Sequence, residues 1–473
     1  MNSEEINRIL SFQTCKIVAP AGHGKTEMIS QLVLLSEGTQ LILTHTNAGV
    51  DALRKRMVKN HVPNKKYTIF TIAGFCMLWC RSFPVLSEID PSLNPLDKKH
   101  STLYYNQLYK GTNKIFLHKW AQEILGNSFT GLIVDEYQDC MIEQHEIFCS
   151  IAKILPVRVL GDPMQAIFQW AGELIDMDKL LFPNVDIETQ PWRWVSSNLD
   201  LGQWISQVRN ALQPTLAGVH QSINFLDIEG CVKLLPSTNF NGNRLISELR
   251  NHSSVAYITA LENKQLSFAQ SMGGFFQFDE KQKSDLLYKF AEEFSRSYGT
   301  LLCRNLLNFL QSCASHVSTE LESYIKRLEN GSFDFVRIQK HKPLGNILIE
   351  LNRSSNRFFI KQAIDYVTVN PLFNVYRREA FVEMKRAIDL SEETGLDLLE
   401  SMSAIRHDQN NHGFYKRLST RTVLAKGLEF DCVIVDLSKR FTSQDFYVAI
   451  SRAKKMVYIL SDHRNIVFTG RKS

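Results

Sequence analysis

An apolar run, a glycine-containing loop and a helical pattern follow one another without interruption between residues 16 and 35. The loop reads Ala19-Pro20-Ala21-Gly22-His23-Gly24-Lys25-Thr26 and stands between a predicted strand at 16–19 and a predicted helix at 28–35. In this context the backbone N–H groups and the helix N-terminus can surround phosphates, because Gly22 and Gly24 allow close approach and Lys25 adds positive charge. The segment therefore predicts a phosphate-binding loop at the end of a strand.

Short β-branched runs recur along the chain with helical segments between them. Continuous apolar strands of this kind are typical of a parallel sheet that helices cover on both faces. Because the pattern occurs in both halves, we expect an α/β fold with two such domains. The predicted strands are 16–19, 41–44, 67–71, 132–134 and 157–160 in the first half, and 232–235, 255–258, 432–435 and 457–460 in the second.

The composition excludes several classes of protein. The chain has 473 residues, of which 44% are hydrophobic and 22% charged, so it is too apolar to be disordered. Its 9 cysteines contain no CxxC pair, which argues against a disulfide framework or a zinc ribbon. No stretch reaches the roughly 20 apolar residues of a membrane span, and the acidic start is unlike a signal peptide. We therefore expect a cytoplasmic protein without a membrane partner.

A second motif places acidic side chains directly after an apolar strand. The sequence Gly131-Leu132-Ile133-Val134-Asp135-Glu136-Tyr137-Gln138-Asp139 runs from near-apolar residues into a carboxylate pair. Such a strand end can present Asp135 to Mg²⁺ and Glu136 to the water that attacks a phosphoryl group. The pair could instead cap a helix, but the phosphate-binding loop upstream favours nucleotide hydrolysis.

Three further motifs complete a series along the chain. They are Gly161-Asp162-Pro163-Met164-Gln165-Ala166-Ile167-Phe168-Gln169-Trp170, Ala425-Lys426-Gly427-Leu428-Glu429-Phe430-Asp431 and Tyr447-Val448-Ala449-Ile450-Ser451-Arg452-Ala453. Together with the two motifs above, and in the same order, they resemble the UvrD/Rep class of superfamily 1 DNA helicases. The resemblance implies tandem RecA-like P-loop motor domains with ATP and Mg²⁺ between them, each with an inserted, mostly helical subdomain.

The resemblance also divides the chain into segments. The first RecA-like domain would consist of 1–81 and 121–190, with an insertion at 82–120 between them. The second would consist of 191–274 and 419–473, with an insertion at 275–418.

Individual residues receive roles from the same resemblance. Gln165 would sense the γ-phosphate, and Arg193 and Arg452 would be arginine fingers that act with the catalytic Glu136. Cations delivered from the opposite domain stabilise the transferring phosphoryl group only when the cleft closes, so closure and chemistry would be coupled. The expected ATP-binding residues are Ala21, Gly22, His23, Gly24, Lys25, Thr26, Glu27, Trp192, which would stack on adenine, and Glu429, which would hold the ribose; Thr26 and Asp135 would hold Mg²⁺.

Single-stranded DNA, or DNA with a single-stranded end, is the expected track. Motif position implies contacts from His45, Thr46, Asn47, Thr71, Phe168 and Trp170. Aromatic faces stack on bases irrespective of sequence, which makes Trp170 the strongest candidate; a buried Trp that anchors its loop is the alternative. A basic segment at 326–361 offers another surface for a polyanion, or a solvated helix face.

Some residues depart from the family pattern near these sites. His45 stands where the family has Phe, Ala171 and Glu27 each stand where it has Arg, and Val423 and Leu424 replace polar residues. These positions hold DNA or the nucleotide in the family. We therefore expect the isolated chain to unwind long duplexes poorly.

The expected function is that of an ATP hydrolase and DNA helicase, a single-stranded DNA translocase whose 3′ to 5′ polarity the resemblance implies. The alternative is a regulatory DNA-sensing ATPase subunit that controls a partner nuclease in antiviral defence. It arises because the compact chain also resembles the helicase-like subunit of Gabija-type anti-phage systems. The aromatic end of the third motif disfavours an RNA helicase.

Overall fold

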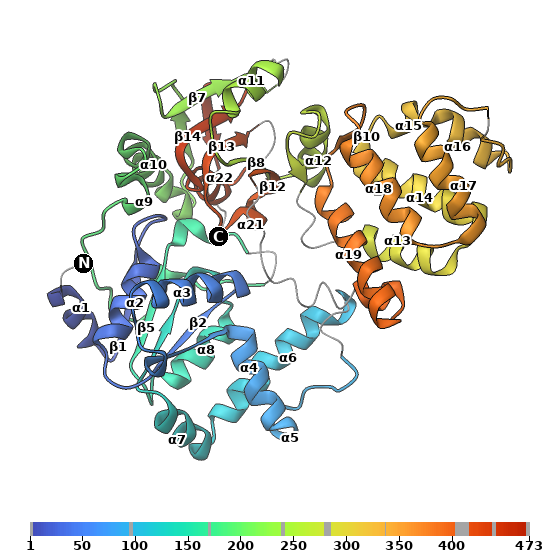
Figure 1. Cartoon of the computed structure of the whole chain (residues 1–473). Coiled ribbons are helices and arrows are strands. Elements are labelled where there is room, and N and C mark those ends of the chain that lie inside the picture. Colours follow the sequence, from blue (N-terminus) through green and yellow to red (C-terminus); the bar gives the residue numbers. More distant parts are fainter. Residues whose placement is uncertain are drawn as a thin grey trace.

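The computed structural model describes residues 3–93, 98–168, 172–237, 242–278, 285–335, 337–402, 416–437 and 441–469. Two parallel sheets and a separate group of helices make up the molecule, and Figure 1 shows these parts beside one another. The expected α/β class with tandem RecA-like domains is confirmed, and each predicted strand overlaps an observed strand. All nine cysteines are free thiols. Within the described ranges, no helix is long and apolar enough to cross a membrane.

The first sheet has five parallel strands in the order β1-β5-β4-β2-β3. They are β1 (Thr14–Val18), β2 (Gln40–Thr44), β3 (Tyr67–Thr71), β4 (Gly131–Val134) and β5 (Val157–Gly161). One face packs against α1 (Ser3–Leu10), α2 (Lys25–Leu35) and α3 (Asn47–Lys59); the other packs against α4 (Ile72–Ser82), α6 (Lys98–Phe116), α7 (Lys119–Ser128) and α8 (Ile142–Ile151). Because the strands are parallel, the loops that follow β1, β2, β4 and β5 meet at one edge.

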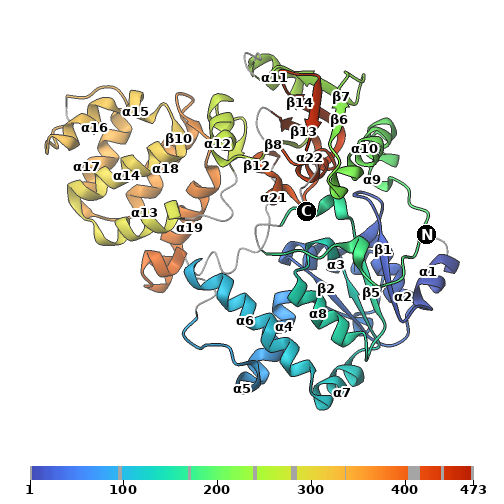
Figure 2. The same cartoon turned by 180° about the vertical axis from the view of Figure 1, so that it is seen from behind.

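The second sheet has six parallel strands in the order β7-β14-β13-β8-β12-β9. They are β7 (Val232–Leu235), β8 (Val255–Thr259), β9 (Gln277–Phe278), β12 (Arg417–Arg421), β13 (Phe430–Asp436) and β14 (Ala453–Leu460). Helices α10 (Leu199–Leu212) and α22 (Ser443–Ile450) cover one face, and α11 (Gly242–Leu249) and α12 (Glu262–Ser271) cover the other. Strands β6 (Gln221–Asn224) and β15 (Asn465–Phe468) pair antiparallel, and Figure 2 shows β6 beside this sheet.

A further group of helices forms a unit with its own apolar core. They are α13 (Asp285–Arg296), α14 (Gly299–Cys313), α15 (Val317–Glu320), α16 (Glu322–Glu329), α17 (Lys342–Ser354), α18 (Phe358–Val369) and α19 (Arg378–Thr394), with a short hairpin of β10 (Ala314–Ser315) and β11 (Asn374–Val375). The range 275–418 also contains β9 and the start of β12, which pair within the second sheet. The range 82–120 holds α5 (Pro84–Ser87) and α6, and α6 contributes Leu108 and Phe116 to the core of the first domain.

Candidate nucleotide-binding site

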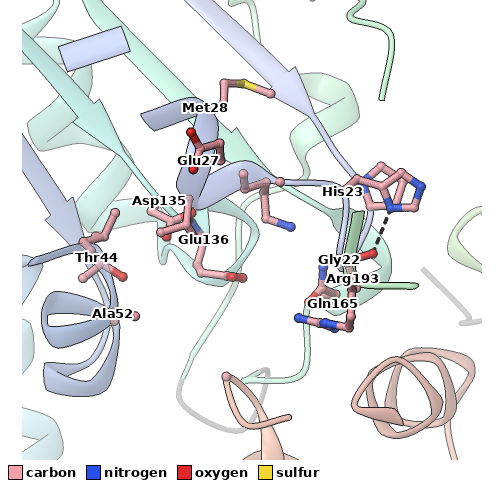
Figure 3. Close-up of a pocket in the computed structure, with 18 of the residues that line it drawn as sticks. Gly22, His23, Glu27, Met28, Thr44, Ala52, Asp135, Glu136, Gln165 and Arg193 are labelled. Carbon is pink, nitrogen blue, oxygen red and sulfur yellow. Dashed lines mark hydrogen bonds between the residues drawn. The ribbon is translucent and has the colours of Figure 1, made fainter. Parts of the chain in front are cut away.

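A cavity of about 1000 Å³ lies where the two sheet domains meet, and both domains line it. The first sheet contributes the loops at the carboxyl ends of its strands. The second contributes Glu429 and Arg452, which directly precede β13 and β14. Figure 3 shows Asp135 and Glu136 in this cavity, with Gln165 and Arg193 beside Gly22. The lining residues include all of the expected ATP-binding, metal-binding and catalytic positions: Ala21, Gly22, His23, Gly24, Lys25, Thr26, Glu27, Asp135, Glu136, Gln165, Trp192, Arg193, Glu429 and Arg452.

The phosphate-binding loop has backbone geometry that favours glycine. Gly22 and Gly24 have φ angles of 73° and 87°, in the left-handed region. A Cβ atom on Gly22 would lie 2.7 Å from the ring of Trp194, which is buried and donates from Nε1 to Ala453 O at 2.7 Å. The loop is therefore packed directly against the second domain. Lys25 opens α2, and its Nζ donates to Ala19 O at 2.9 Å.

The acidic pair after β4 is held by local hydrogen bonds. Asp135 Oδ1 accepts the Glu136 N–H at 2.9 Å, and Glu136 has a left-handed φ of 56°. Gln138 Nε2 donates to Glu136 Oε2 at 2.5 Å. Burial, and then the charge of Glu136, raises the pKa of Asp135. Burial alone would also raise the pKa of Glu136, but the Lys426 and Lys25 cations hold it below its ordinary value.

The expected metal ligands suit Mg²⁺ chemically. The Thr26 hydroxyl and the Asp135 carboxylate line one cavity, and both are oxygen donors of the kind that Mg²⁺ prefers alongside phosphate oxygens. The residues present therefore fit this ion.

Two arginines enter the cavity from the second domain. Arg452 is buried; it donates to Val448 O at 3.0 Å, to Ser451 Oγ at 2.8 Å and to Gln165 Oε1 at 3.4 Å. Burial, and then the nearby Arg193, lowers the pKa of Arg452 to about 10. Arg193 donates from Nε and Nη2 to Glu429 Oε1 at 3.0 and 2.7 Å. Arg193 and Glu429, for which we expected separate roles, thus form an ion pair in this structure.

Lys426 crosses between the domains, although the sequence analysis assigned it no role. Its Nζ contacts the Asp139 carboxylate, Gln165 O at 2.7 Å and Glu136 Oε2 at 3.7 Å. The only signal in the sequence was its place in the motif at 425–431. An ion pair between residues so far apart in the chain leaves no local pattern.

The residues expected to contact DNA are divided among several places. His45, Thr46 and Phe168 line the cavity, and Lys426 Nζ lies 5.2 Å from the centroid of the Phe168 ring. The hydroxyls of Thr46 and Thr71 accept backbone N–H groups as the N-caps of α3 and α4. Asn47 and Thr71 are not among the residues that line the cavity. Trp170 lies outside the described residues.

Several lysines of the basic segment 326–361 have acidic partners within the helical unit. Lys326 pairs with Glu322 at 2.6 Å, and Lys340 pairs with Glu320 at 2.9 Å. Lys361 lies 2.6 Å from Asp389 and 3.0 Å from Glu392. These three lysines are thus paired with carboxylates of their own unit, and Lys326 among them lies on an exposed helix face.

Comparisons with known proteins agree with a nucleotide site in the first domain. Residues 2–171 match the family model described as AAA domain, which implies that this part of the chain binds ATP. A stretch of 89 residues, 18% of this chain, is 34% identical to the "Probable DNA helicase II homolog" of Mycoplasma capricolum subsp. capricolum, of which it covers 11%.

The chain is also similar to solved helicase structures at low identity. One is the PRRSV helicase, with 10% identity, a TM-score of 0.35, and coverage of 98% of this chain and 55% of that one. Another is Arterivirus nonstructural protein 10 (helicase) in complex with DNA, with 9% identity, a TM-score of 0.33, and coverage of 97% and 63%. The chain therefore spans less than two thirds of the length of each of these relatives.

Proposed function

We propose that this protein is an ATP hydrolase of helicase superfamily 1 that moves along single-stranded DNA in the 3′ to 5′ direction. The observation that carries the proposal is the composition of the cavity: the phosphate-binding loop and Glu136 from one domain face Arg452 and Lys426 from the other. A site divided in this way makes hydrolysis depend on domain closure, because the charge of the transferring phosphoryl group needs cations from both sides. The likeness to a DNA helicase II homolog supports DNA as the track.

The residues that match the motifs have separate chemical tasks in this proposal. The backbone N–H groups of the loop and Lys25 bind the β- and γ-phosphates. Thr26 and Asp135 would hold Mg²⁺, which neutralises phosphate charge when it is bound. Glu136 orients the attacking water and accepts its proton, while Gln138 holds the Glu136 carboxylate in place. Gln165 and Arg452, which already contact one another, face the γ-phosphate.

Turnover measurements with different nucleic acids test this function. We expect single-stranded DNA to stimulate ATP hydrolysis more than duplex DNA or RNA does. Glu136→Gln should abolish turnover and keep nucleotide binding, whereas Lys25→Ala should lose both, because Lys25, unlike Glu136, binds the phosphates directly in this proposal. Glu123→Gln, on the exposed surface of α7, is the matched control. Near wild-type turnover in Glu136→Gln, or equal stimulation by RNA, would contradict the proposal.

A partner nuclease and a role in antiviral defence stay predictions of the resemblance to Gabija-type subunits. The test is whether a nuclease encoded beside this protein co-purifies with it and changes activity on addition of ATP. Absence of both effects would remove the regulatory alternative.

A further inference from the structure

A buried ion pair joins the two domains beside the phosphate-binding loop. Asp162 follows β5 in the first domain, and Arg209 lies on α10 of the second. Arg209 Nη2 is 2.8 Å from Asp162 Oδ1, and the side chains are 9% and 0% exposed. Although burial would raise the pKa of Asp162, the Arg209 guanidinium holds it below its ordinary value. Both groups therefore stay charged in the interface.

Asp162 connects this pair to the catalytic side of the cavity. Its Oδ2 accepts a hydrogen bond from Gln165 Nε2 at 3.1 Å. Its backbone N–H donates to Gln138 Oε1 at 2.9 Å, and Gln138 in turn holds Glu136. One continuous set of hydrogen bonds, buried except for the partly buried Gln138–Glu136 bond, thus runs from Arg209 to Gln165 and Glu136. These are the residues assigned above to the γ-phosphate and the attacking water.

Arg209 also reaches the phosphate-binding loop through a neighbour. Its guanidinium lies 6.0 Å from the centroid of the Tyr447 ring, and the Tyr447 hydroxyl accepts the Ala21 N–H at 2.9 Å. Tyr447 is buried on α22, so α10 and α22 contact the site from the same side. Arg209 therefore lies next to the contacts of both the loop and the hydrolytic residues, in an interface that Lys426 and Arg452 also cross.

The energetics of a buried ion pair explain why it would position the residues bonded to it. Removing two charges from water is unfavourable, and only their mutual contact in good geometry offsets that cost. If the domains shift, Asp162 loses its partner and must rearrange, and Gln165 and Gln138 move with it. An apolar contact would tolerate such a shift, because apolar packing is not directional.

We propose that Arg209 is a positioning residue that holds Gln165 and Glu136 in their hydrolytic arrangement only when the second domain is docked. The inference rests on the proposed ATP hydrolysis and extends it. It assigns the coupling between domain orientation and turnover to one ion pair, whose arginine lies outside the motifs of the second domain.

Steady-state kinetics and nucleotide binding test the inference. Arg209→Gln and Asp162→Asn should each lower kcat by about 10- to 100-fold, as when the residue that orients a metal ligand is replaced, with little change in the Kd for ATP. Arg209→Lys should restore part of kcat, since it keeps the charge. The double variant should lose little more than either single variant, because the two residues act as one unit.

The control is an ion pair that lies within the second domain. Lys233 and Glu248 are 2.8 Å apart, and Lys233→Gln should leave kcat unchanged. Equal kcat values for Arg209→Gln and this control, measured below both melting temperatures, would overturn the inference while leaving the proposed function intact.

Hydrogen exchange separates the inference from the proposed function. If the wild-type chain did not hydrolyse ATP, the proposed function would be contradicted. The rate of backbone hydrogen exchange at 136–139 and 162–168 would then test the positioning role of Arg209. Faster exchange in Arg209→Gln than in Lys233→Gln supports the positioning role, and equal exchange overturns it.

Discussion

At the scale of single residues, the two arginines that the second domain contributes to the cavity differ in their contacts. Arg452 is buried and already contacts Gln165, whereas Arg193 is paired with Glu429. Arg193 therefore has to leave Glu429, or share it with a ligand, to reach a phosphate. This difference between the two arginines was not visible in their motifs.

Replacing either arginine should slow turnover strongly. We expect Arg452→Ala and Arg193→Ala each to lower kcat by about 10³ or more, with a smaller change in nucleotide binding, because an arginine finger acts on the transition-state charge. Steady-state ATP hydrolysis and equilibrium binding measure the two effects. Arg304→Ala, at an exposed position of α14, is the control. An unchanged kcat in either variant would remove that arginine from the catalytic set.

His45 should remain neutral well below the pH at which a free imidazole titrates. Burial, and then the Lys426 cation, lowers its pKa from 6.5 to about 4; Glu136 acts in the opposite sense, and Cys140 Sγ lies 3.4 Å from Nε2. Between these pH values the unfolded chain binds a proton that the folded chain excludes. Folding stability should therefore fall as the pH drops from 6.5 toward 4.

A substitution at this position isolates the effect of His45. In His45→Phe, which restores the residue of the family pattern, the loss of stability across this pH window should become smaller. Denaturant unfolding at a series of pH values measures it, with the exposed His220→Phe as the control. Identical pH profiles for His45→Phe and the wild type would show that His45 is not the source.

At the scale of elements, hydrogen bonds from an arginine of β5 hold α1 against the first sheet. Arg158 is buried; it donates to Ile9 O at 3.3 Å and to Leu10 O at 2.8 Å. Leu10 O has no partner within the helix, so the guanidinium satisfies it, while Ile9 O also accepts the Phe12 N–H at 3.3 Å. Helix α1 also carries Glu5 into the lining of the cavity.

Removing this guanidinium should loosen α1. We expect Arg158→Met to destabilise the protein by about 1–3 kcal/mol, because Leu10 O would lose its donor and Ile9 O would lose one of its two donors. The melting temperature and hydrogen exchange over residues 3–12 report the change. Arg54→Met, on the exposed side of α3, should alter stability by less than about 0.5 kcal/mol. Equal effects of the two substitutions would contradict this role of Arg158.

At the scale of the whole molecule, we expect the chain to hydrolyse ATP even with duplexes that it unwinds poorly. His45 is packed against Cys140 where the family has a stacking Phe, and Val423 lines the cavity where the family has a polar residue. Each missing contact should weaken the free energy of DNA binding by about 1 kcal/mol. The isolated chain should therefore hydrolyse ATP with single-stranded DNA but unwind long duplexes poorly.

A comparison of duplex lengths measures this directly. Unwinding should decline steeply from short to long duplexes while the ATP hydrolysis rate stays constant. Efficient unwinding of the long duplexes by the purified chain, without a partner, would contradict the expectation and restore an autonomous helicase.

The sequence alone did not predict the strands β6, β9, β10, β11, β12 and β15 or a role for Lys426. It did predict the five strands of the first sheet, four strands of the second, the parallel α/β class and the other residues expected around the cavity. These are local properties: an apolar run of a few residues predicts its own strand, and glycines at fixed spacing determine where a loop can approach a phosphate. Their proposed roles remain predictions. The boundary between the helical unit and the second sheet was less predictable. Strand β9, which lies at this boundary, has only two residues and therefore almost no sequence pattern of its own.

Only the tertiary structure decided which charged groups face one another across the domains. The pairs Arg193–Glu429, Lys426–Asp139 and Asp162–Arg209 join residues from different elements, and nothing in the spacing of either partner selects the other. Their contacts depend on how α10 and the ends of the two sheets pack, and that packing is the sum of many apolar contacts along the chain. For this reason a motif can indicate that an arginine belongs near the cavity, while its partner and its freedom to move follow from the docked domains.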